Sequence, residues 1–230
     1  MNVAIVVAAG KGTRLGGDRA KQFIELGGIP IIIRALQQFE LSKEIDDVIA
    51  VLPADETAGF ESVVQRFALG KVTRVVAGGA TRAQSVRNGL NEISEAEIVA
   101  VHDGVRPFVT PDEIDATVSA ARVSGAAILT VPVADTIKAV RNDRVVRTLP
   151  RRMLRRALTP QCFRFDILRR AYDHLAEVPE SIVLTDDSQL VERLGVKVVT
   201  VEGSARNIKI TNEEDLVFAE AILKSVVSCP

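Results

Sequence analysis

The segment Val3-Ala4-Ile5-Val6-Val7-Ala8-Ala9-Gly10-Lys11-Gly12-Thr13-Arg14 decides the fold class, because an uninterrupted apolar run leads directly into a glycine-containing loop. A run without polar residues is typical of a strand that is covered on both faces, as in a parallel sheet between two layers of helices. Gly10 and Gly12 let the backbone turn tightly and bring its amide groups close to an anion. The segment therefore predicts a buried strand followed by a phosphate-binding loop.

Apolar runs and stretches of helical spacing alternate along the rest of the chain. The strands are predicted at 3–9, 47–52, 72–77, 98–102, 126–131, 196–201 and 207–210. The helices are predicted at 30–39, 60–69, 82–93, 111–123, 165–175, 187–194 and 213–226. This alternation predicts a single α/β domain over residues 1–230 with a doubly wound, mostly parallel sheet. Binding residues in such sheets follow the carboxyl ends of the strands.

Residues 134–158 interrupt this alternation. Two stretches with a period of two residues, 136–140 and 144–149, flank the turn-like pair Asn142-Asp143, which indicates an antiparallel hairpin. A hairpin inserted late in a doubly wound domain is often an arm that packs on a partner. We therefore expect an inserted β-arm that contributes to a homodimer.

The composition excludes several classes of partner. Lys and Arg number 29 against 30 Asp and Glu, so the chain has no general attraction for nucleic acid or anionic membranes. The basic run 151–156 lacks interleaved aromatic residues and is better interpreted as a face that binds one phosphate monoester, with a solvated face that binds no ligand as the alternative. No apolar run approaches the roughly 18–20 residues that span a bilayer. Cys162 and Cys229 fit neither a disulfide framework nor a metal motif, and we expect reduced thiols in a cytoplasmic protein.

The loop after the first predicted strand places two cations, Arg14 and Lys21, within a turn or two of its glycines. It does not match two familiar nucleotide motifs. A dinucleotide fingerprint needs a third glycine where Leu15 stands, and a Walker loop needs Gly-Lys-Ser/Thr, whereas Gly17 is followed by Asp18. What remains is a phosphate loop followed by positive charge.

Two further loops follow predicted strands. Residues 78–85 lead from paired glycines into a helix with Arg82 and Ser85 on its first turn, and helix N-termini attract anions. Residues 102–107 place an acid, Asp103, where it can bind ribose hydroxyls or lie near a metal-bound phosphate. In a parallel sheet, all three loops converge on one edge.

The sequence shows residues suited to binding phosphate but no evident catalytic base. A fourth group of polar residues lies downstream, at Thr136, Arg151, Thr159 and Lys209. No serine–histidine–acid arrangement is evident, and the two histidines do not suggest a histidine-rich metal site. A phosphate monoester is already ionised near neutral pH, so as a nucleophile it needs charge neutralisation and in-line placement rather than a base. Cations, backbone amides and Mg²⁺ supply both.

Taken together, these motifs resemble the 2-C-methyl-D-erythritol 4-phosphate cytidylyltransferase family, whose members use CTP. The resemblance runs from Ala8 to about Leu216. The motifs that carry it are Ala8-Ala9-Gly10-x-Gly12-x-Arg14, Lys21-Gln22, Gly78-Gly79-x-x-Arg82-x-x-Ser85-Val86, His102-Asp103-x-x-Arg106-Pro107, Thr136, Thr159-Pro160-Gln161, Thr185-Asp186 and Asn207-Ile208-Lys209-Ile210-Thr211. The first loop alone marks many sugar-nucleotide pyrophosphorylases, whereas the full set in this order is far more specific. One departure is Ala20, which stands where the family usually has proline.

The resemblance implies a fold like that of nucleotide-diphospho-sugar transferases and a role for each candidate residue. The implied nucleotide-binding residues are Ala8, Ala9, Gly10, Gly12, Gly79, Arg82, Ser85, Asp103 and Gly104. The implied acceptor-binding residues are Arg106, Thr136, Arg151, Thr159 and Lys209, with Thr136 and Arg151 supplied by the other subunit through the arm. The implied catalytic cations are Arg14, Lys21, Arg151 and Lys209. Mg²⁺ is expected mainly on the triphosphate, with no protein ligand named.

Three other activities stay open on the sequence alone. The nearest is cytidylyl transfer to a pentitol phosphate such as ribitol 5-phosphate, because those enzymes share most of these motifs. A function of another class is that of a regulator that binds a nucleotide without catalysis. An oxidoreductase is disfavoured by the incomplete glycine fingerprint.

Overall fold

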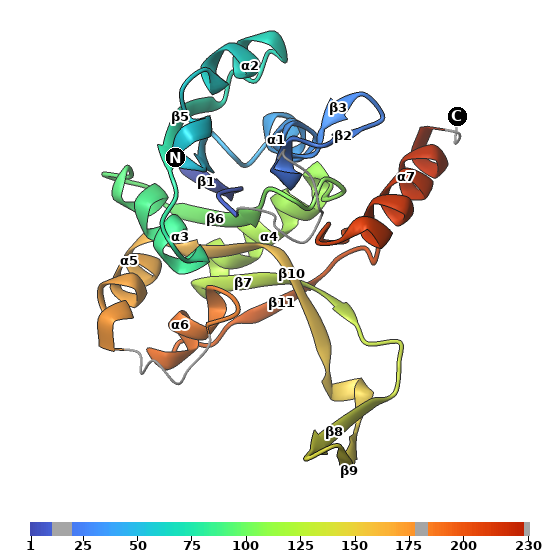
Figure 1. The fold of residues 1–230 in the computed structure, drawn as a ribbon. Helices are drawn as coiled ribbons and strands as arrows, with labels where there is room; N and C mark the ends of the chain where they lie inside the picture. The colour runs from blue at the N-terminus through green and yellow to red at the C-terminus, as the bar shows by residue number, and fades with distance from the viewer. Residues whose placement is uncertain (11–19, 178–183, 228–230) are drawn as a thin grey trace.

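A seven-stranded sheet with the order β11-β7-β10-β6-β1-β4-β5 forms the centre of the molecule (Figure 1). The computed structural model describes residues 1–10, 20–177 and 184–227. The strands of the central sheet are β1 (Asn2–Val7), β4 (Asp47–Leu52), β5 (Val72–Ala77), β6 (Ile98–Asp103), β7 (Ala126–Pro132), β10 (Arg155–Arg164) and β11 (Val199–Glu202). Strand β10 runs antiparallel to both of its neighbours, and the other pairs are parallel. The predicted doubly wound, mostly parallel sheet is confirmed.

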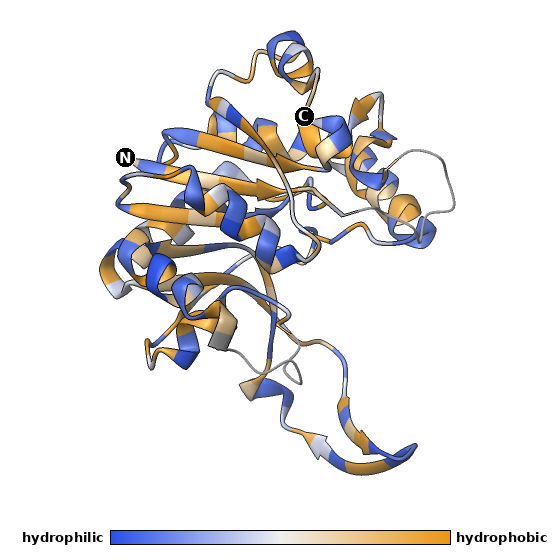
Figure 2. Cartoon of the chain, turned by 60° about the vertical axis from the view of Figure 1, so that its left-hand side comes forward, coloured by the Kyte–Doolittle hydropathy of each residue, from blue (hydrophilic) through white to orange (hydrophobic). Residues whose placement is uncertain are grey.

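Helices cover both faces of this sheet. They are α1 (Ile31–Leu41), α2 (Phe60–Arg66), α3 (Arg82–Asn91), α4 (Pro111–Ser124), α5 (Phe165–Asp173), α6 (Ser188–Arg193) and α7 (Glu213–Val227). Alternate residues of β1 point to opposite layers: Ala4 and Val6 pack with α1, α2 and α4, whereas Ile5 packs with α3, α5 and α6. Figure 2 shows the apolar residues concentrated in the strands between the two layers. The uninterrupted apolar run of β1 is therefore explained by burial on both faces.

The predicted hairpin is present as β8 (Ile137–Arg141) and β9 (Arg144–Leu149), an antiparallel pair that extends away from the sheet (Figure 1). Asn142 and Asp143 both adopt positive φ angles, +49° and +59°, as the tight turn requires. A smaller antiparallel pair, β2 (Glu25–Leu26) and β3 (Ile29–Pro30), precedes α1. Short 3₁₀ turns complete the described elements at Lys21–Phe23, Ala54–Glu56, Arg151–Met153 and Leu175–Glu177.

Two sequence-based expectations are wrong. Residues 207–210 are not a strand: the chain there crosses the carboxyl ends of the sheet, and Ile210 N–H makes a single bond of 2.9 Å to Val105 O instead of a ladder. Strand β10 was not predicted at all, although it lies between β6 and β7. Within the described residues, no helix is both long and apolar enough to cross a bilayer.

Candidate active site

A pocket of about 580 Å³ opens at the carboxyl ends of β1 and β6, beside the start of α3. The residues that line it are Val7, Ala8, Ala9, Gly10, Lys21, Gln22, Gly79, Ala80, Thr81, Arg82, Ser85, Asp103, Val105, Lys209 and Thr211. A second cavity of about 550 Å³ runs along α2 and β5, but its lining has one charged residue, Glu61, and no cation. Only the first of these two pockets has the charge to hold a polyphosphate.

The predicted residues fall into four groups. The pocket brings together the predicted residues Ala8, Ala9, Gly10, Lys21, Gly79, Arg82, Ser85, Asp103 and Lys209. Gly104, Arg106 and Thr159 lie against this group without lining the pocket, and Thr136 and Arg151 belong to the arm region. Gly12 and Arg14 lie outside the described residues.

Backbone hydrogen bonds carry the sheet into the binding loops. Ala8 N–H donates to Val51 O at 2.8 Å, Gly78 N–H to Leu52 O at 2.7 Å, and Gly104 N–H to Val7 O at 2.8 Å. The loops are therefore extensions of strands β1, β5 and β6 and converge on one edge, as the parallel topology predicts. Their approach is close, since a Cβ on Gly78 would lie 2.1 Å from Ala9 Cβ.

The N-terminus of α3 forms one wall of the pocket. Thr81 caps the helix: its hydroxyl accepts from Gln84 N–H at 3.1 Å, and Gln84 Oε1 accepts from Thr81 N–H at 3.3 Å. Ser85 is buried, and its hydroxyl accepts from Gly79 N–H at 3.0 Å while it donates to Thr81 O at 2.9 Å. A hydroxyl oxygen has a second lone pair, so Ser85 still has room for a donor from a ligand.

Asp103 is the charged centre of the site. Its Oδ1 accepts from Arg82 Nε at 3.0 Å, and its Oδ2 lies 3.0 Å from Lys209 Nζ and 3.4 Å from Arg106 Nε. Burial alone would raise the pKa of Asp103, but the three cations outweigh burial and hold that pKa far below its usual range. Asp103 is therefore ionised at every physiological pH.

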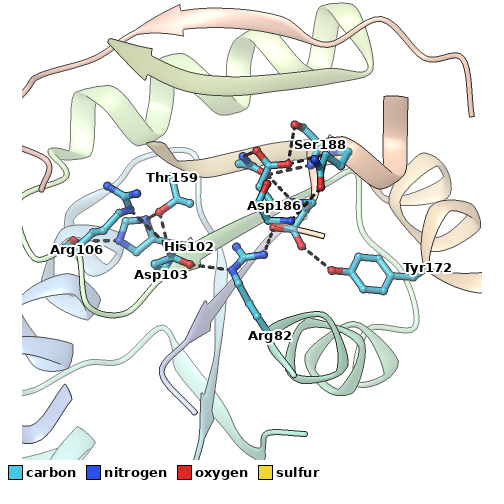
Figure 3. Close-up of polar contacts among 12 residues, drawn as sticks. Arg82, His102, Asp103, Arg106, Thr159, Tyr172, Asp186 and Ser188 are labelled. Atoms are coloured by element: carbon cyan, nitrogen blue, oxygen red, sulfur yellow. Dashed lines mark hydrogen bonds and ion pairs between the residues drawn. The ribbon is translucent and has the colours of Figure 1, made fainter. Parts of the chain in front are cut away.

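A buried histidine supports this carboxylate from behind. Thr159 Oγ accepts from Asp103 N–H at 3.1 Å and lies 2.9 Å from His102 Nδ1 (Figure 3). We assign the hydroxyl proton to the bond with Nδ1, which leaves His102 Nε2–H to donate to Arg106 O at 3.1 Å. Burial lowers the pKa of His102 to about 4. The imidazole is thus neutral and fully engaged, and it holds Thr159 and the 102–106 loop in place.

Lys21 and Lys209 come from opposite ends of the sequence and line the same pocket. Thr211, which also lines the pocket, donates from its backbone N–H and its hydroxyl to Asp215 Oδ2 at 2.7 and 2.6 Å. Burial raises the pKa of Asp215, but these hydrogen bonds, that from Asn212 N–H and the nearby charge of Lys21 lower it overall. The start of α7 is therefore tied to the cationic side of the pocket.

Several residues of the site were not identified from the sequence. Asp187 contacts Arg82, and Tyr172 donates to Asp187. Gln161 accepts a hydrogen bond from the backbone N–H of Asp187. The sequence signals were the motifs Thr159-Pro160-Gln161 and Thr185-Asp186, and the resemblance gave no role to Gln161 or Asp186. Gln22 lines the pocket with an almost fully buried side chain, and among the described residues its Nε2 has no hydrogen-bond partner.

The described residues contain no group of three or more His, Cys, Asp or Glu side chains arranged to hold a metal ion. Among the described residues that line the pocket, Asp103 is the only one with a carboxylate, and both of its oxygens are paired with cations. A metal ion bound here would take its ligands from the phosphate groups of a substrate.

Comparison with known proteins gives a consistent result. The sequence model of the family 2-C-methyl-D-erythritol 4-phosphate cytidylyltransferase (IspD) matches residues 2–225. The enzyme of that name from Clostridium novyi is 43% identical, with 99% of each chain covered. The one from Geotalea uraniireducens is 45% identical, over 98% of this chain and 97% of that one.

Solved structures agree with the sequence relatives. The 4-diphosphocytidyl-2C-methyl-D-erythritol synthase of Anaerococcus prevotii superposes with a TM-score of 0.85 at 32% identity, covering 97% of this chain and 96% of that one. The cytidylyltransferase of Thermus thermophilus gives a TM-score of 0.78 at 32% identity, covering 97% and 100%. Together with the pocket formed by the predicted loops, these matches show that the chain belongs to the 2-C-methyl-D-erythritol 4-phosphate cytidylyltransferase family.

Proposed function

We propose that the protein transfers CMP from CTP to 2-C-methyl-D-erythritol 4-phosphate, giving 4-diphosphocytidyl-2-C-methyl-D-erythritol and pyrophosphate in non-mevalonate isoprenoid biosynthesis. The observation that carries this function is the pocket in which Lys21 and Lys209 meet the backbone of the first loop, in a chain of this family. An oxygen of the acceptor phosphate forms a bond to the α-phosphorus of CTP. The bond from that phosphorus to the bridging oxygen of the β-phosphate breaks, and pyrophosphate takes the electron pair.

The nucleotide is assigned to the wall made by β1, α3 and β6. Backbone groups of Ala8, Ala9 and Gly79, with the Ser85 hydroxyl, face the space in which cytosine would lie. Asp103 is ionised and accessible from the pocket, which suits it to accept hydrogen bonds from ribose hydroxyls. Gly104 keeps the next backbone unit close to β1, since a Cβ there would lie 2.9 Å from Ala8 Cβ.

The cations are assigned to the phosphate groups. Lys21, which lines the pocket, is assigned to the triphosphate, and Lys209 to the meeting point of donor and acceptor. Arg14, which lies outside the described residues, is also assigned to the triphosphate. Negative charge grows on the oxygens around the α-phosphorus during transfer, and cations fixed in a pocket stabilise it without reorganisation. The buried, neutral His102 does not line the pocket, so the residues present favour an acceptor phosphate that attacks in its ionised form.

Mg²⁺ is proposed as the metal cofactor, bound mainly through the triphosphate. The support is the donor set of the pocket, in which the carboxylate of Asp103 is occupied by Arg82, Arg106 and Lys209. When bound, the ion would neutralise phosphate charge. Meanwhile Lys21 and Lys209 would align the reacting groups.

The acceptor phosphate is assigned to Arg106, Thr159 and Lys209 of one chain and to Thr136 and Arg151 of a second copy. Arg151 is exposed and donates to Ala134 O at 2.6 Å, within the arm rather than the pocket. The arm also exposes Val140, Val145 and Val146 by 59–62%. An apolar, protruding arm supports a homodimer in which it reaches the partner's pocket. Because its substrates are phosphorylated metabolites, we place the enzyme in the cytoplasm.

Pyrophosphate release tests the function. CTP, UTP, ATP and GTP are each assayed with 2-C-methyl-D-erythritol 4-phosphate and with ribitol 5-phosphate. Turnover is expected with CTP and the methylerythritol acceptor. Turnover only with ribitol 5-phosphate would show that ribitol 5-phosphate is the acceptor. Tight CTP binding without turnover with either acceptor would indicate a non-catalytic regulator.

A further inference from the structure

A buried carboxylate, Asp187, lies behind the pocket with the polar side chains of Tyr172 and Gln161. Asp187 is 1% exposed and does not line the pocket. Its Oδ1 accepts from the Tyr172 hydroxyl at 2.5 Å, and its backbone N–H donates to Gln161 Oε1 at 3.0 Å. These contacts tie together α5, β10 and the residue that precedes α6. Figure 3 shows Tyr172 on the far side of Arg82 from His102.

The carboxylate of Asp187 has a single cationic partner among the described residues. Its Oδ2 lies 2.9 Å from Arg82 Nη1, and this close ion contact lacks the alignment of a hydrogen bond. A charge that is nearly fully buried is costly, and a well-packed apolar side chain would usually stabilise such a site as well. The charge is therefore better explained by what it does to Arg82 than by general stability.

Arg82 bridges two carboxylates. Its Nε donates to Asp103 Oδ1 on the pocket side, and its Nη1 contacts Asp187 on the inner side. The side chain is 25% exposed, and its planar guanidinium is held at both ends. Without Asp187, the inner end of the guanidinium would lose its anchor and could rotate toward the pocket. Asp103 would then lose the fixed partner of its Oδ1.

The position of Asp103 controls that of Lys209. Both Lys209 and Arg106 contact Asp103 Oδ2, whereas Arg82 contacts Oδ1. Fixing Oδ1 sets the plane of the carboxylate and thus the direction in which Oδ2 presents Lys209 to the pocket. The chain of contacts runs from Tyr172 through Asp187, Arg82 and Asp103 to Lys209.

We propose that Asp187, supported by Tyr172, is a positioning residue of the nucleotide site: it anchors Arg82 so that Asp103 and Lys209 are aligned before CTP binds. The inference rests on the proposed function, because it takes CTP as the ligand of the pocket. Asp187 does not line the pocket, so its proposed effect on CTP binding is indirect.

The test measures CTP binding directly by calorimetry, alongside steady-state kinetics. Asp187→Asn keeps the shape and removes the charge. We expect the Kd and KM for CTP to rise about tenfold, the scale for losing one contact to a charged group. The kcat should fall by a smaller factor. Tyr172→Phe removes one hydroxyl and should shift both constants in the same direction by less, and Asp187→Glu should recover part of the affinity.

Asp47→Asn is the matched control. Asp47 is also a buried carboxylate, and it lies 2.5 Å from Arg74 Nη2. It is the first residue of β4, so it lies at the amino ends of the parallel strands, whereas the pocket opens at their carboxyl ends. Asp47→Asn should lower the melting temperature and leave the Kd for CTP unchanged. An effect of Asp187→Asn that matches this pattern, with CTP binding within twofold of the parent, would overturn the proposal.

A thermodynamic cycle removes the remaining ambiguity. If Asp187 acts through Arg82, adding Asp187→Asn to Arg82→Gln should change the Kd for CTP by no further factor. Independent, multiplicative effects would contradict the proposed route. Should Asp187→Asn fail to fold, Tyr172→Phe in the same cycle decides the question. Absence of CTP binding by the parent protein would instead reject the proposed function.

Discussion

At the scale of single residues, Gly78 shows how closely the loops of the site approach one another. A Cβ at this position would lie 2.1 Å from Ala9 Cβ and 2.9 Å from Ser85 Oγ. Both neighbours line the pocket. We expect Gly78→Ala to push Ala9 and Ser85 into the space assigned to cytosine. It should raise the KM for CTP and destabilise the protein by about 1–3 kcal/mol, the usual range for overpacking.

Gly70→Ala is the control for this effect, because a Cβ there would meet Glu40 Oε1 at an ordinary 3.5 Å. Steady-state kinetics and thermal unfolding of both variants check the expectation. A Gly78→Ala enzyme with an unchanged KM for CTP would contradict the placement of the base.

His102 makes stability depend on pH. Burial lowers its pKa to about 4, whereas an unfolded histidine titrates near 6.5. Between these values the unfolded chain binds the proton and the native protein does not, so the free energy of unfolding falls as the pH falls from about 6.5 to 4. The full loss is about 3 kcal/mol, since one pKa unit corresponds to about 1.4 kcal/mol.

Urea unfolding at several pH values measures this slope. We expect His102→Gln to flatten the slope over that range, whatever its effect on overall stability. His174→Gln replaces the other histidine, which is exposed, and should leave the slope unchanged. A parent-like slope in His102→Gln would show that other groups cause the dependence. The lowered pKa of Asp103 changes the free energy of unfolding only at lower pH, because the carboxyl of the unfolded chain titrates near pH 4.

The residues that could be predicted are those that follow strands. Lys21 and Asp103 were found because local motifs follow predicted strands, and parallel topology then requires the strand ends to converge. Lys209 was found through the family motif at 207–211, since the strand predicted at 207–210 does not form. Asp187 and Tyr172 could not be assigned in this way. Arg82 lies 90 positions before Tyr172 and 105 before Asp187, and only the tertiary structure brings the three together.

At the scale of elements, the start of α3 offers a matched test against the start of α4. Both helices begin with a complete capping box, Thr81 with Gln84 and Thr110 with Glu113. Both threonines are exposed, but only Thr81 lines the pocket. Thr81→Ala and Thr110→Ala should each cost about 1 kcal/mol of stability, the usual loss for an N-cap.

Only Thr81→Ala should raise the KM for CTP, because α3 carries Arg82 and Ser85 on its first turn. Thermal unfolding and CTP titration of the two variants separate the local role from general stability. Equal effects on CTP binding would mean that the N-terminus of α3 has no special part in the site.

Elements with a clear period were predicted well, and β10 shows why one was not. Its sequence, Arg-Arg-Ala-Leu-Thr-Pro-Gln-Cys-Phe-Arg, begins with charges and contains a proline, which is usually excluded from central strands. The structure accommodates Pro160 because the pairing with β7 shifts between Ala157 and Gln161. Tertiary pairing on both sides therefore overrides a weak local preference.

At the scale of the whole molecule, the open question is whether one chain contains a complete site. Lys21 and Lys209 line one pocket, whereas Arg151 follows the hairpin β8–β9 and donates to Ala134 O. If the arm serves a second copy, mixing two inactive variants should restore activity. A dimer of Lys21→Ala with Arg151→Ala has one site with an intact pocket and an intact partner arm. Random exchange should therefore recover about a quarter of the parental activity, since half of the dimers are mixed and each has one working site.

Lys21→Ala mixed with Lys209→Ala is the control, because both residues belong to the pocket of a single chain. No mixed dimer of this pair has a complete pocket, so activity should stay at the level of the separate variants. Affinity capture of a tagged Lys21→Ala subunit, with the untagged variant measured in the captured fraction, establishes that the subunits exchange. If exchange occurs and the first mixture stays inactive, Arg151 serves its own chain. The two pairs together decide which cations share a chain and which meet only across the interface, and this division determines whether the enzyme can act as a monomer.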